Sequence, residues 1–526
     1  MQAQHFSSDE LLRFDPLIQN LIRKSPDIKP FVHDFASVDA LLKQTAEKKL
    51  SDDLRTLLRR VLQEQYQNVN AHESVLSNIE LLSTQSTFTI TTGHQLCLFT
   101  GPLYSIFKVI STIKLAQQLK AADPTINFVP VFWMASEDHD AAEINHAYFF
   151  GKKVEWDIPA SGPVGRFDTS GIRLLIDVLR EYLGVNDRES KSIELLSRAY
   201  QEKSLADATR YLFNELFGSY GLVILDADHP ELKRAFKQEM SNELLDEVSF
   251  NAISSTNKEL MQLEHRLQIN PRNINLFYLH QSGRKRIERK GDVWNVVDTD
   301  KQWTQTELLS ELELHPENFS PNVALRPVYQ EKILPNLAYI GGPGEIAYWL
   351  QLKKSFEAHG VLFPLLVLRD SALLLSDKIK SNMSKLGLSS VDVFGDKSTL
   401  EKRIVNAAEI SLDVETKAVA EMMIGLESKA AAVDPTLSGA VQAETQKMLN
   451  GLSQIEKKIV RALKQKEEVK LGQLNKLLQD IFPDGVLQER HDNYFQYRFA
   501  FGEDLIQILM REFNPLQNQF TIISNE

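Results

Sequence analysis

The sequence predicts an α/β fold in which a mostly parallel sheet with crossover helices carries an antiparallel insertion and is followed by a long helical hairpin. Three observations support this fold class. Short β-rich apolar runs alternate with helical patterns between about residues 86 and 375. One stretch within that region has strands joined by tight turns. Beyond it the strands stop, and segments rich in Ala, Leu, Glu and Lys follow.

The size and composition of the chain exclude several classes of protein. With 526 residues it is long for one hydrophobic core, so two or three domains are expected. A formal charge of −12 argues against a nucleic-acid surface, which needs basic patches. The single cysteine allows no internal disulfide and fits a reducing cytoplasm. The start lacks a signal-peptide pattern and the longest apolar runs are too short for a membrane span, so we expect a cytoplasmic protein.

The predicted elements follow from the spacing of apolar residues. Residues 8–85 have apolar positions three and four apart, which indicates helices. The runs "STFTITT", "FVPVFWMA", "GLVILDAD" and "VLFPLLVL" come next, and several are apolar throughout, as in strands buried on both faces. Helical patterns lie between them, at 102–121, 172–183, 190–217 and 345–359.

The insertion and the hairpin have different patterns. Residues 274–298 contain two or three strands joined at Ser-Gly and Gly-Asp, which predicts an antiparallel meander. Its basic run, Arg284–Lys290, is interpreted as the solvated face of a hairpin. Residues 398–431 and 440–480 are helical in composition, and the break "AVDPTLSG" between them predicts a turn. Two such helices form an antiparallel coiled coil, whose apolar seam is a natural homodimer surface.

The first candidate site is "TTGHQLCLFTGPLYSIFK" (91–108). It places a glycine-rich turn between a strand end and a helix that begins near Gly101 and Pro102. Unpaired backbone N–H groups and the helix dipole at such a turn suit an anion such as a nucleotide phosphate. The alternative is a tight turn with no ligand, since the stretch has neither a Walker pattern nor GxGxxG.

The second candidate site, "SEDHDAAEINH" (136–146), follows a predicted buried strand. A helix beginning near Asp138 would place His139, Glu143 and His146 on one face. Such a set could bind a divalent metal or hold amine and hydroxyl groups of a substrate, and we predict no metal. The alternative is a helix cap at Ser136 or Asp138 with polar neighbours in solvent.

The third candidate site lies within residues 320–356. Gly341-Gly342-Pro343-Gly344 precedes Glu345 at the start of an amphipathic helix, which predicts a second helix N-terminus open to an anion. Arg326, expected to be extended because Pro327 follows it, is a candidate partner for a carboxylate or phosphate. A surface loop that ends in a good helix start is the alternative.

These three blocks, together with the rest of the chain, resemble the BshC family, the cysteine ligases of bacillithiol biosynthesis. The resemblance implies a Rossmann-like core related to class I nucleotidyltransferases and aminoacyl-tRNA synthetases, with connecting-peptide insertions at about 146–170 and 250–320. It also implies a coiled coil that mediates homodimerisation. The implied reaction joins L-cysteine to the glucosamine amine of glucosaminyl-malate, with activation of the cysteine carboxylate by ATP. An ADP site beside the coiled coil is a further implication.

On this basis the chain is divided into four parts. Residues 1–85 are the N-terminal helical part of the core, 86–375 the Rossmann-like core with its insertions, 376–485 the coiled-coil domain and 486–526 a tail that packs on the core. The tail segment "LQERHDNYFQY" and "KLGLSS" (385–390) are the candidate second nucleotide site, where aromatic side chains could stack on adenine and an arginine could meet phosphates. The alternative is a tail that is docked by its aromatic residues.

The predicted site residues follow from the motifs and the implied reaction. The catalytic candidates, one of which would accept the amine proton, are Asp138, His139 and Asp140. The candidates for substrate binding are Gly93, His94, Gln95, Tyr104, Lys108, His146, Arg326, Gly342 and Glu345. The candidates for nucleotide binding are Gly387, Arg490, Asn493, Tyr494 and Tyr497. Cys97, the lone thiol, is interpreted as a core residue.

Two departures from the expected patterns bear on function. The position of His94 is a glutamine in members of the family, so His94 is not an obligatory base. The H-I-G-H signature of the synthetases is also missing, and only Thr100, Gly101 and Leu103 match its flanking pattern. The alternative function is therefore a non-catalytic, dimeric scaffold that binds nucleotide. Aminoacylation of tRNA is disfavoured by the acidic charge.

Overall fold

The structure is a computed structural model that describes residues 2–158, 161–183, 187–405, 411–502 and 505–525. The chain divides into two compact units. The core unit contains Gln2–Leu374 and Gln488–Ile523, and the C-terminal unit contains Leu375–Leu487 with the last residues from Ser524.

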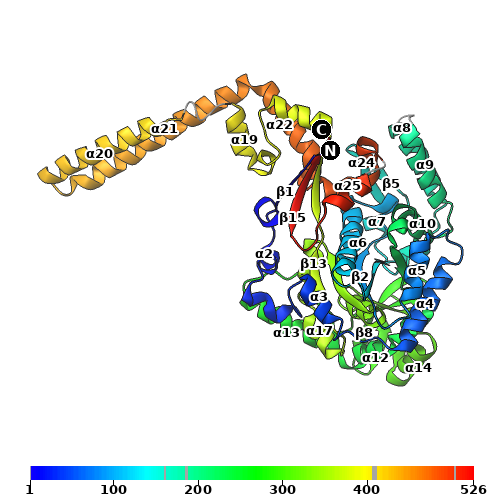
Figure 1. Ribbon diagram of the computed structural model, residues 1–526. Helices are drawn as coiled ribbons and strands as arrows, with labels where there is room; N and C mark the ends of the chain where they lie inside the picture. The colour runs from blue at the N-terminus through cyan, green and yellow to red at the C-terminus, as the bar shows by residue number, and fades with distance from the viewer. Residues whose placement is uncertain (1, 159–160, 184–186, 406–410, 503–504, 526) are drawn as a thin grey trace. The chain divides into compact units, whose positions relative to one another are not determined.

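Five parallel strands form the central sheet of the core unit, in the order β13-β12-β2-β3-β6 (Figure 1). They are β2 (Thr87–His94), β3 (Asn127–Met134), β6 (Val223–Asp226), β12 (Asn336–Gly341) and β13 (Leu365–Leu368). Four of them are predicted apolar runs, and their burial confirms strands covered on both faces. β12 is absent from the predicted strands, because its short run beside a Gly-Gly-Pro-Gly turn has no periodicity of its own.

The strand order reverses beside β2. The chain runs from β2 to β3 and β6 on one side, then returns to place β12 and β13 on the other. Helix α6 (Tyr104–Ala122), which joins β2 to β3, is buried over most of its length. In open α/β sheets, ligands bind at such a reversal, outside the carboxyl ends of the strands.

Helices surround this sheet (Figure 1). The N-terminal part contains β1 (Gln2–Ser7), α1 (Ser8–Leu11), α2 (Pro16–Ile22), a 3₁₀ turn (Pro26–Phe31), α3 (Val38–Gln44), α4 (Asp52–Tyr66) and α5 (Glu73–Leu81). After β3 come α7 (Ala141–Ile144), a hairpin of β4 (His146–Phe149) and β5 (Lys152–Glu155), α8 (Ile172–Leu183), α9 (Asp187–Ala199) and α10 (Leu205–Phe217). After β6 come α11 (Pro230–Ala235), α12 (Lys237–Asp246) and α13 (Val248–Gln262), and α15 (Arg326–Ile333), α16 (Pro343–Trp349) and α17 (Lys353–Ala358) flank β12.

The predicted meander forms a second, antiparallel sheet in the order β10-β9-β8-β7-β11. Its strands are β7 (Leu276–His280), β8 (Gly283–Lys290), β9 (Val293–Val296), β10 (Gln302–Thr304) and β11 (Phe319–Pro321), with α14 (Gln305–Leu314) before β11. The basic run lies on β8. Its interpretation as a solvated face is wrong for Arg284, which is buried, because alternate residues of a strand point to opposite faces.

The segment after the C-terminal unit returns to the core. It contains α23 (Gln488–His491), α24 (Tyr494–Phe501), α25 (Leu505–Glu512) and β15 (Gln519–Ser524), and β15 lies between β1 and β14 (Ser371–Leu375) in a third sheet. The buried side chains of Gln488 and Glu489 accept hydrogen bonds from the backbone N–H groups of Leu374 (2.6 Å) and Ala372 (3.1 Å). These bonds fasten the returning chain to β14.

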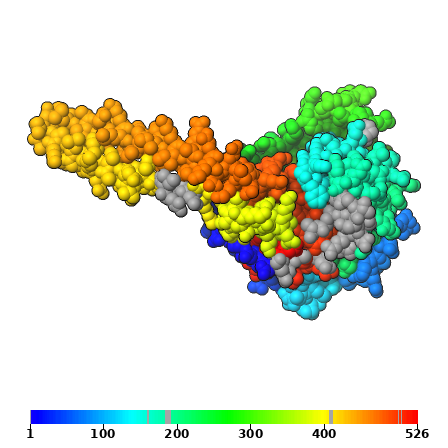
Figure 2. Space-filling view, turned by 90° about the horizontal axis from the view of Figure 1, so that it is seen from above, coloured from blue at the N-terminus to red at the C-terminus, as the bar shows by residue number. Residues whose placement is uncertain are grey.

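The C-terminal unit is helical. It contains α18 (Asp377–Lys385), α19 (Lys397–Ile404), α20 (Asp413–Val433), α21 (Leu437–Lys466) and α22 (Glu468–Ile481). Helices α20 and α21 lie side by side as a long hairpin (Figures 1 and 2). The turn between them contains Asp434 and Pro435, and the Asp434 carboxylate accepts from the N–H and the hydroxyl of Thr436. The predicted antiparallel coiled coil is thus confirmed. Among the described helices, none has the length and apolar character that crossing a membrane requires.

We predict a pH-dependent stability of the core unit that is due to Asp370. This buried carboxylate accepts hydrogen bonds from Ser111 Oγ and from the N–H of Asn514, both at 2.8 Å, and burial raises its pKa to about 6. The folded chain therefore binds this proton more tightly than the unfolded chain. Stability is highest below about pH 4 for this group and falls as the pH rises to about 6.

The variant Asp370→Asn cannot ionise, so its stability should lack this fall, which is about 2 kcal/mol in the parent chain. Urea unfolding followed by tryptophan fluorescence measures the core alone, because all five tryptophans lie in the core unit. An identical pH dependence in parent and variant between pH 4 and 6 would contradict the prediction.

Candidate functional site

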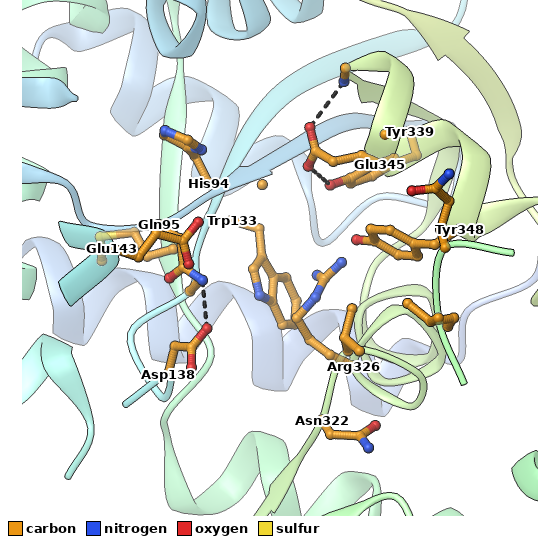
Figure 3. Close-up of a pocket in the computed structure, with 18 of the residues that line it drawn as sticks. His94, Gln95, Trp133, Asp138, Glu143, Asn322, Arg326, Tyr339, Glu345 and Tyr348 are labelled. Carbon is orange, nitrogen blue, oxygen red and sulfur yellow. Dashed lines mark hydrogen bonds between the residues drawn. The ribbon is translucent and has the colours of Figure 1, made fainter. Parts of the chain in front are cut away.

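A cavity of about 490 Å³ opens at the carboxyl ends of the central strands, within the core unit. This volume suits a small-molecule ligand. Figure 3 shows Asp138, Gln95 and Glu143 on one side and Glu345, Tyr339 and Tyr348 on the other, with Trp133 and Arg326 between them. The loops after β2, β3, β12 and β13 all contribute, so the crevice predicted at this edge of the sheet is present.

Lys108 and Glu345 form a buried ion pair at the reversal of the strand order. Lys108 Nζ lies 2.8 Å from both carboxylate oxygens of Glu345 and also donates to the carbonyl of Gly93. Burial opposes ionisation of Glu345, but the Lys108 ammonium keeps the pKa of this carboxyl below its usual value. With its three contacts inside the protein, Lys108 lies beneath the cavity and does not line it.

The N-terminus of α16 is capped by a carboxylate of the same helix. The N–H of Gly342 donates to Glu345 Oε2 (2.9 Å), and the Tyr339 hydroxyl donates to Oε1 (3.0 Å). The Gly342 N–H is therefore not free for an anion, contrary to the expectation for this helix start, because the Glu345 carboxylate of the same helix accepts from it. Gly342 and Glu345 still line the cavity.

In the loop before α6, backbone N–H groups are likewise hydrogen-bonded within the protein. Phe99, Thr100 and Gly101 all have positive φ, at 55°, 73° and 76°. The N–H of Phe99 donates to the Tyr200 hydroxyl (2.7 Å), and that of Gly101 to the carbonyl of Leu98. These amides therefore do not point outward to an anion, contrary to the prediction for this turn.

Asn493 holds this strained loop. Its side-chain amide donates to the carbonyls of Phe99 (2.8 Å) and Gly101 (2.9 Å), and the carbonyl of Asp492 accepts from the N–H of Leu103 (2.8 Å). Two consecutive non-glycine residues in the left-handed region cost of the order of 1–3 kcal/mol each, which such contacts offset. The tail thus stabilises the loop that leads into α6.

Asp138 lines the cavity and has several hydrogen-bond and charge partners there. Its carboxylate accepts from the Gln95 side chain and from the N–H of His139 (2.7 Å), and Arg284 Nη1 lies 3.5 Å away. Burial would raise the pKa of Asp138, but the His139 contacts and the Arg284 charge hold it far below its usual range. Asp138 is therefore a carboxylate that can orient a cation.

The other residues of this motif are placed differently. The predicted helix face is wrong, because α7 spans only Ala141–Ile144: His139 precedes it and His146 begins β4. Asp140 is exposed and caps α7, where it accepts from the N–H of Glu143 (3.2 Å). Neither His139, Asp140 nor His146 lines the cavity, so Asp138 and Arg326 meet there without His139. His139 nevertheless contacts Asp138, with Nδ1 3.3 Å from Oδ1.

Glu143 lines the cavity beside Asp138. Burial raises the pKa of its carboxyl, and the nearby negative charges of Asp138 and Asp140 raise it further. Two neighbouring carboxyl groups thus have pKa values displaced in opposite directions. This is an arrangement in which one carboxylate binds a cation and the other accepts a proton.

His94 lies at another part of the cavity wall. Its ring packs edge-on against Tyr104 at 5.2 Å, and its Nε2 is buried without a hydrogen-bond partner. Burial, reinforced by the charge of Lys108, lowers the pKa of His94 to about 3, so the imidazole is neutral at physiological pH. Cys97 is a buried core residue, as interpreted from the sequence, and burial raises its pKa to about 12.

Arg326 reaches the middle of the cavity from α15. It is the first residue of that helix and not an extended residue as expected, because Pro327 is tolerated in a first helical turn. Its guanidinium lies 5.8 Å from the Trp133 ring and donates to Gln330 Oε1 at 3.0 Å.

The residues predicted to bind a second nucleotide belong to both units. Gly387 belongs to the C-terminal unit, and the others belong to the core unit. Asn493 holds the strained loop, Tyr494 is buried and the Tyr497 hydroxyl donates to Asp492 (2.6 Å), whereas Arg490 lines the main cavity. The three buried residues therefore have packing roles, and the second nucleotide site stays a prediction.

Several residues that line the cavity were not predicted, because no sequence motif marks them. Trp133 and Tyr348 lie in apolar runs, Arg284 lies in a basic run, and Arg369 directly follows a buried strand. A charged residue at a strand end, as at Arg369, is the signal that could have been used. In the described part of the chain, no group of three His, Cys, Asp or Glu side chains is arranged to hold a metal ion.

Comparison with known families agrees with this architecture. The model of the N-terminal Rossmann-like domain of bacillithiol biosynthesis BshC matches residues 1–370, and the model of the C-terminal coiled-coil domain matches residues 372–525. Among solved structures, a putative arginyl-tRNA synthetase from Campylobacter jejuni is 10% identical and covers 88% of this chain and 98% of its own. Its TM-score of 0.19 is too low to support any inference.

Three curated relatives are similar over nearly their whole length, and each is named "Putative cysteine ligase BshC". The protein from Flavobacterium johnsoniae is 42% identical over 517 residues, and that from Flavobacterium psychrophilum is 41% identical over 519 residues, with 97% of both chains covered in each case. The protein from Christiangramia forsetii is 39% identical over 534 residues, with 100% of this chain and 99% of the relative covered. With both domain models matched, the chain belongs to the BshC family of bacillithiol biosynthesis.

Proposed function

We propose that this protein is a ligase that joins the carboxyl group of L-cysteine to the glucosamine amine of glucosaminyl-malate. The observation that carries the proposal is membership of a family whose members are named cysteine ligases, over essentially the whole chain. The cavity supports it, because a small ligand would meet carboxylates on one wall and cationic groups elsewhere.

Amide formation needs an activated carboxyl group, because a free carboxylate is a poor electrophile. We propose ATP as the activating substrate, through either an acyl adenylate or an acyl phosphate. The amine nitrogen then forms the C–N bond, the AMP or phosphate group leaves, and the amine loses a proton. Arg326, in the middle of the cavity, is suited to the negative charge of the leaving group.

Two carboxylates are suited to the amine. Asp138 stays ionised and can bind the incoming ammonium group, and the exposed His139 beside it offers a route for the proton to solvent. Glu143, with its raised pKa, is the better proton acceptor, because a base is most effective when its pKa approaches the working pH. Asp140 is assigned no direct part, since it caps α7.

The first test is activity. The purified chain, incubated with glucosaminyl-malate, L-cysteine and ATP, should form a thiol product whose mass equals the sum of the two substrates less water. Mass spectrometry detects it, and omission of each substrate in turn is the control. ATP binding without product, under conditions in which a relative forms product, would favour the non-catalytic scaffold.

A second test separates the roles of the two carboxylates. Glu143→Gln should lower kcat by about 10²–10³-fold with little change in KM, and the acidic limb of its pH–rate profile should vanish, since the base must be deprotonated to act. Asp138→Asn should raise KM for glucosaminyl-malate about tenfold. Glu155→Gln, at an exposed carboxylate of β5, is the control. Equal effects on kcat and KM in both site variants would refute this division of roles.

We also propose that the chain forms a homodimer through its helical hairpin. Met422, Leu426 and Val433 on α20 are 59%, 49% and 84% exposed, and their spacing of four and seven places them on one face. Light scattering should give twice the chain mass of 59.9 kDa, and Met422→Lys with Leu426→Lys should give the single mass. Lys417→Gln, at an exposed polar position of α20, should stay dimeric. A parent chain that is monomeric at micromolar concentration would end this proposal.

A further inference from the structure

Arg369 lies at the end of the cavity above β13. Its backbone N–H donates to the carbonyl of Gly341 (2.9 Å), and its side chain is only 2% exposed. Nη1 donates to the carbonyl of Asp370 and to Ser371 Oγ, both at 2.9 Å, and Nη2 donates to Glu489 Oε1 at 2.6 Å. The guanidinium is therefore held in one orientation by groups on its far side.

One donor of this guanidinium is left unused. Arg369 Nε is buried and makes no hydrogen bond, although a buried donor without a partner costs about 1–3 kcal/mol. It faces Gly342, where an added Cβ would lie 3.7 Å from it, and both residues line the cavity. This unpaired N–H can therefore donate a hydrogen bond to an acceptor group on a ligand.

A second arginine lines the same part of the cavity. Arg490 follows Glu489 in the sequence, so the residue that holds Arg369 also places Arg490 at the wall. Tyr104 lines the same cavity, and its ring centroid is 5.2 Å from Arg369 Cζ. His94 Nε2, buried and unpaired, packs beside Tyr104 and adds another polar atom.

The cavity therefore presents the carboxyl groups of Asp138 and Glu143 at one end, with Arg284 3.5 Å from Asp138, and arginines at the other. Arg369 follows β13 and Asp138 follows β3, three strand positions away, which is about 14 Å at the usual strand spacing. An anionic group at one end and an amine at the other match the two ends.

A chain of phosphates fits the basic end less well. At the start of α16, the N–H of Gly342 donates to the Glu345 carboxylate and is not free for phosphate. Two separate arginine groups suit two separate carboxylates, with the in-plane donors of a guanidinium pairing with carboxylate oxygens.

We propose that Arg369 and Arg490, with Tyr104 and His94, form a subsite for the two carboxylates of a malyl group and so determine specificity for the malyl end of the amino-sugar substrate. The identity of that substrate rests on the proposed function. The subsite orients the sugar so that its amine faces Asp138 and Glu143.

The test measures binding by calorimetry with L-malate, methyl glucosaminide and ATP as separate probes. Arg490→Gln changes an exposed residue, and Arg369→Lys keeps the charge that pairs with Glu489 but removes Nε. Each should weaken L-malate binding at least tenfold and leave methyl glucosaminide and ATP unchanged. Arg511→Gln, at an exposed arginine on α25, is the control.

Each possible result either supports the proposed subsite or overturns it. Equal malate affinity in the parent chain and in Arg490→Gln overturns it, as does absence of malate binding to the parent chain. A loss of ATP affinity with malate affinity retained also overturns it, because the subsite would then hold phosphate. If Arg369→Lys does not fold, Arg490→Gln alone gives the answer. Malate binding that depends on both arginines, in a chain that forms no thiol product, supports the subsite and refutes the proposed reaction.

Discussion

The buried ion pair between Lys108 and Glu345 is the interaction on which the cavity depends. Lys108 joins the carbonyl of Gly93, at the end of β2, to a carboxylate at the start of α16, so it bridges the two sides of the strand reversal. Removing one partner would leave an unpaired buried charge, at a cost of about 3–5 kcal/mol. The pair therefore ties the end of β2 to the start of α16 beneath the cavity.

The same pair determines which chemistry the cavity can offer. Since the N–H of Gly342 donates to Glu345, and those of Phe99 and Gly101 are bonded within the protein, these three backbone donors are not available to a ligand. Recognition falls instead to side chains. Asp138 and Glu143 follow β3, with Arg284 beside Asp138, and Arg369 and Arg490 also line the cavity. The proposed substrate carries both an amine and carboxylates, as this distribution of side chains requires.

Residues of the segment that follows the C-terminal unit line the cavity or support the residues that line it. Glu489 orients Arg369, Arg490 lines the wall and Asn493 holds the strained loop before α6. These contacts join residues that are more than 100 positions apart in the chain. The roles of Asn493 and Tyr494 as packing residues, where nucleotide contacts were predicted, follow from their burial in this interface.

The sequence by itself determined the elements and the edge of the sheet where function lies. Apolar runs specify buried strands, Pro and Gly specify the hairpin turn, and residues after parallel strands must meet at one edge, which brought Gln95, Asp138 and Glu345 together. Only the tertiary structure decided which polar groups pair. Periodicity reports the face on which a residue lies, whereas the partner of a buried charge is set by distant contacts, 237 positions away for Lys108 and Glu345. Hence Lys108 belongs beneath the cavity, Arg284 is buried beside Asp138, and Arg369 retains a free donor that no local pattern could reveal.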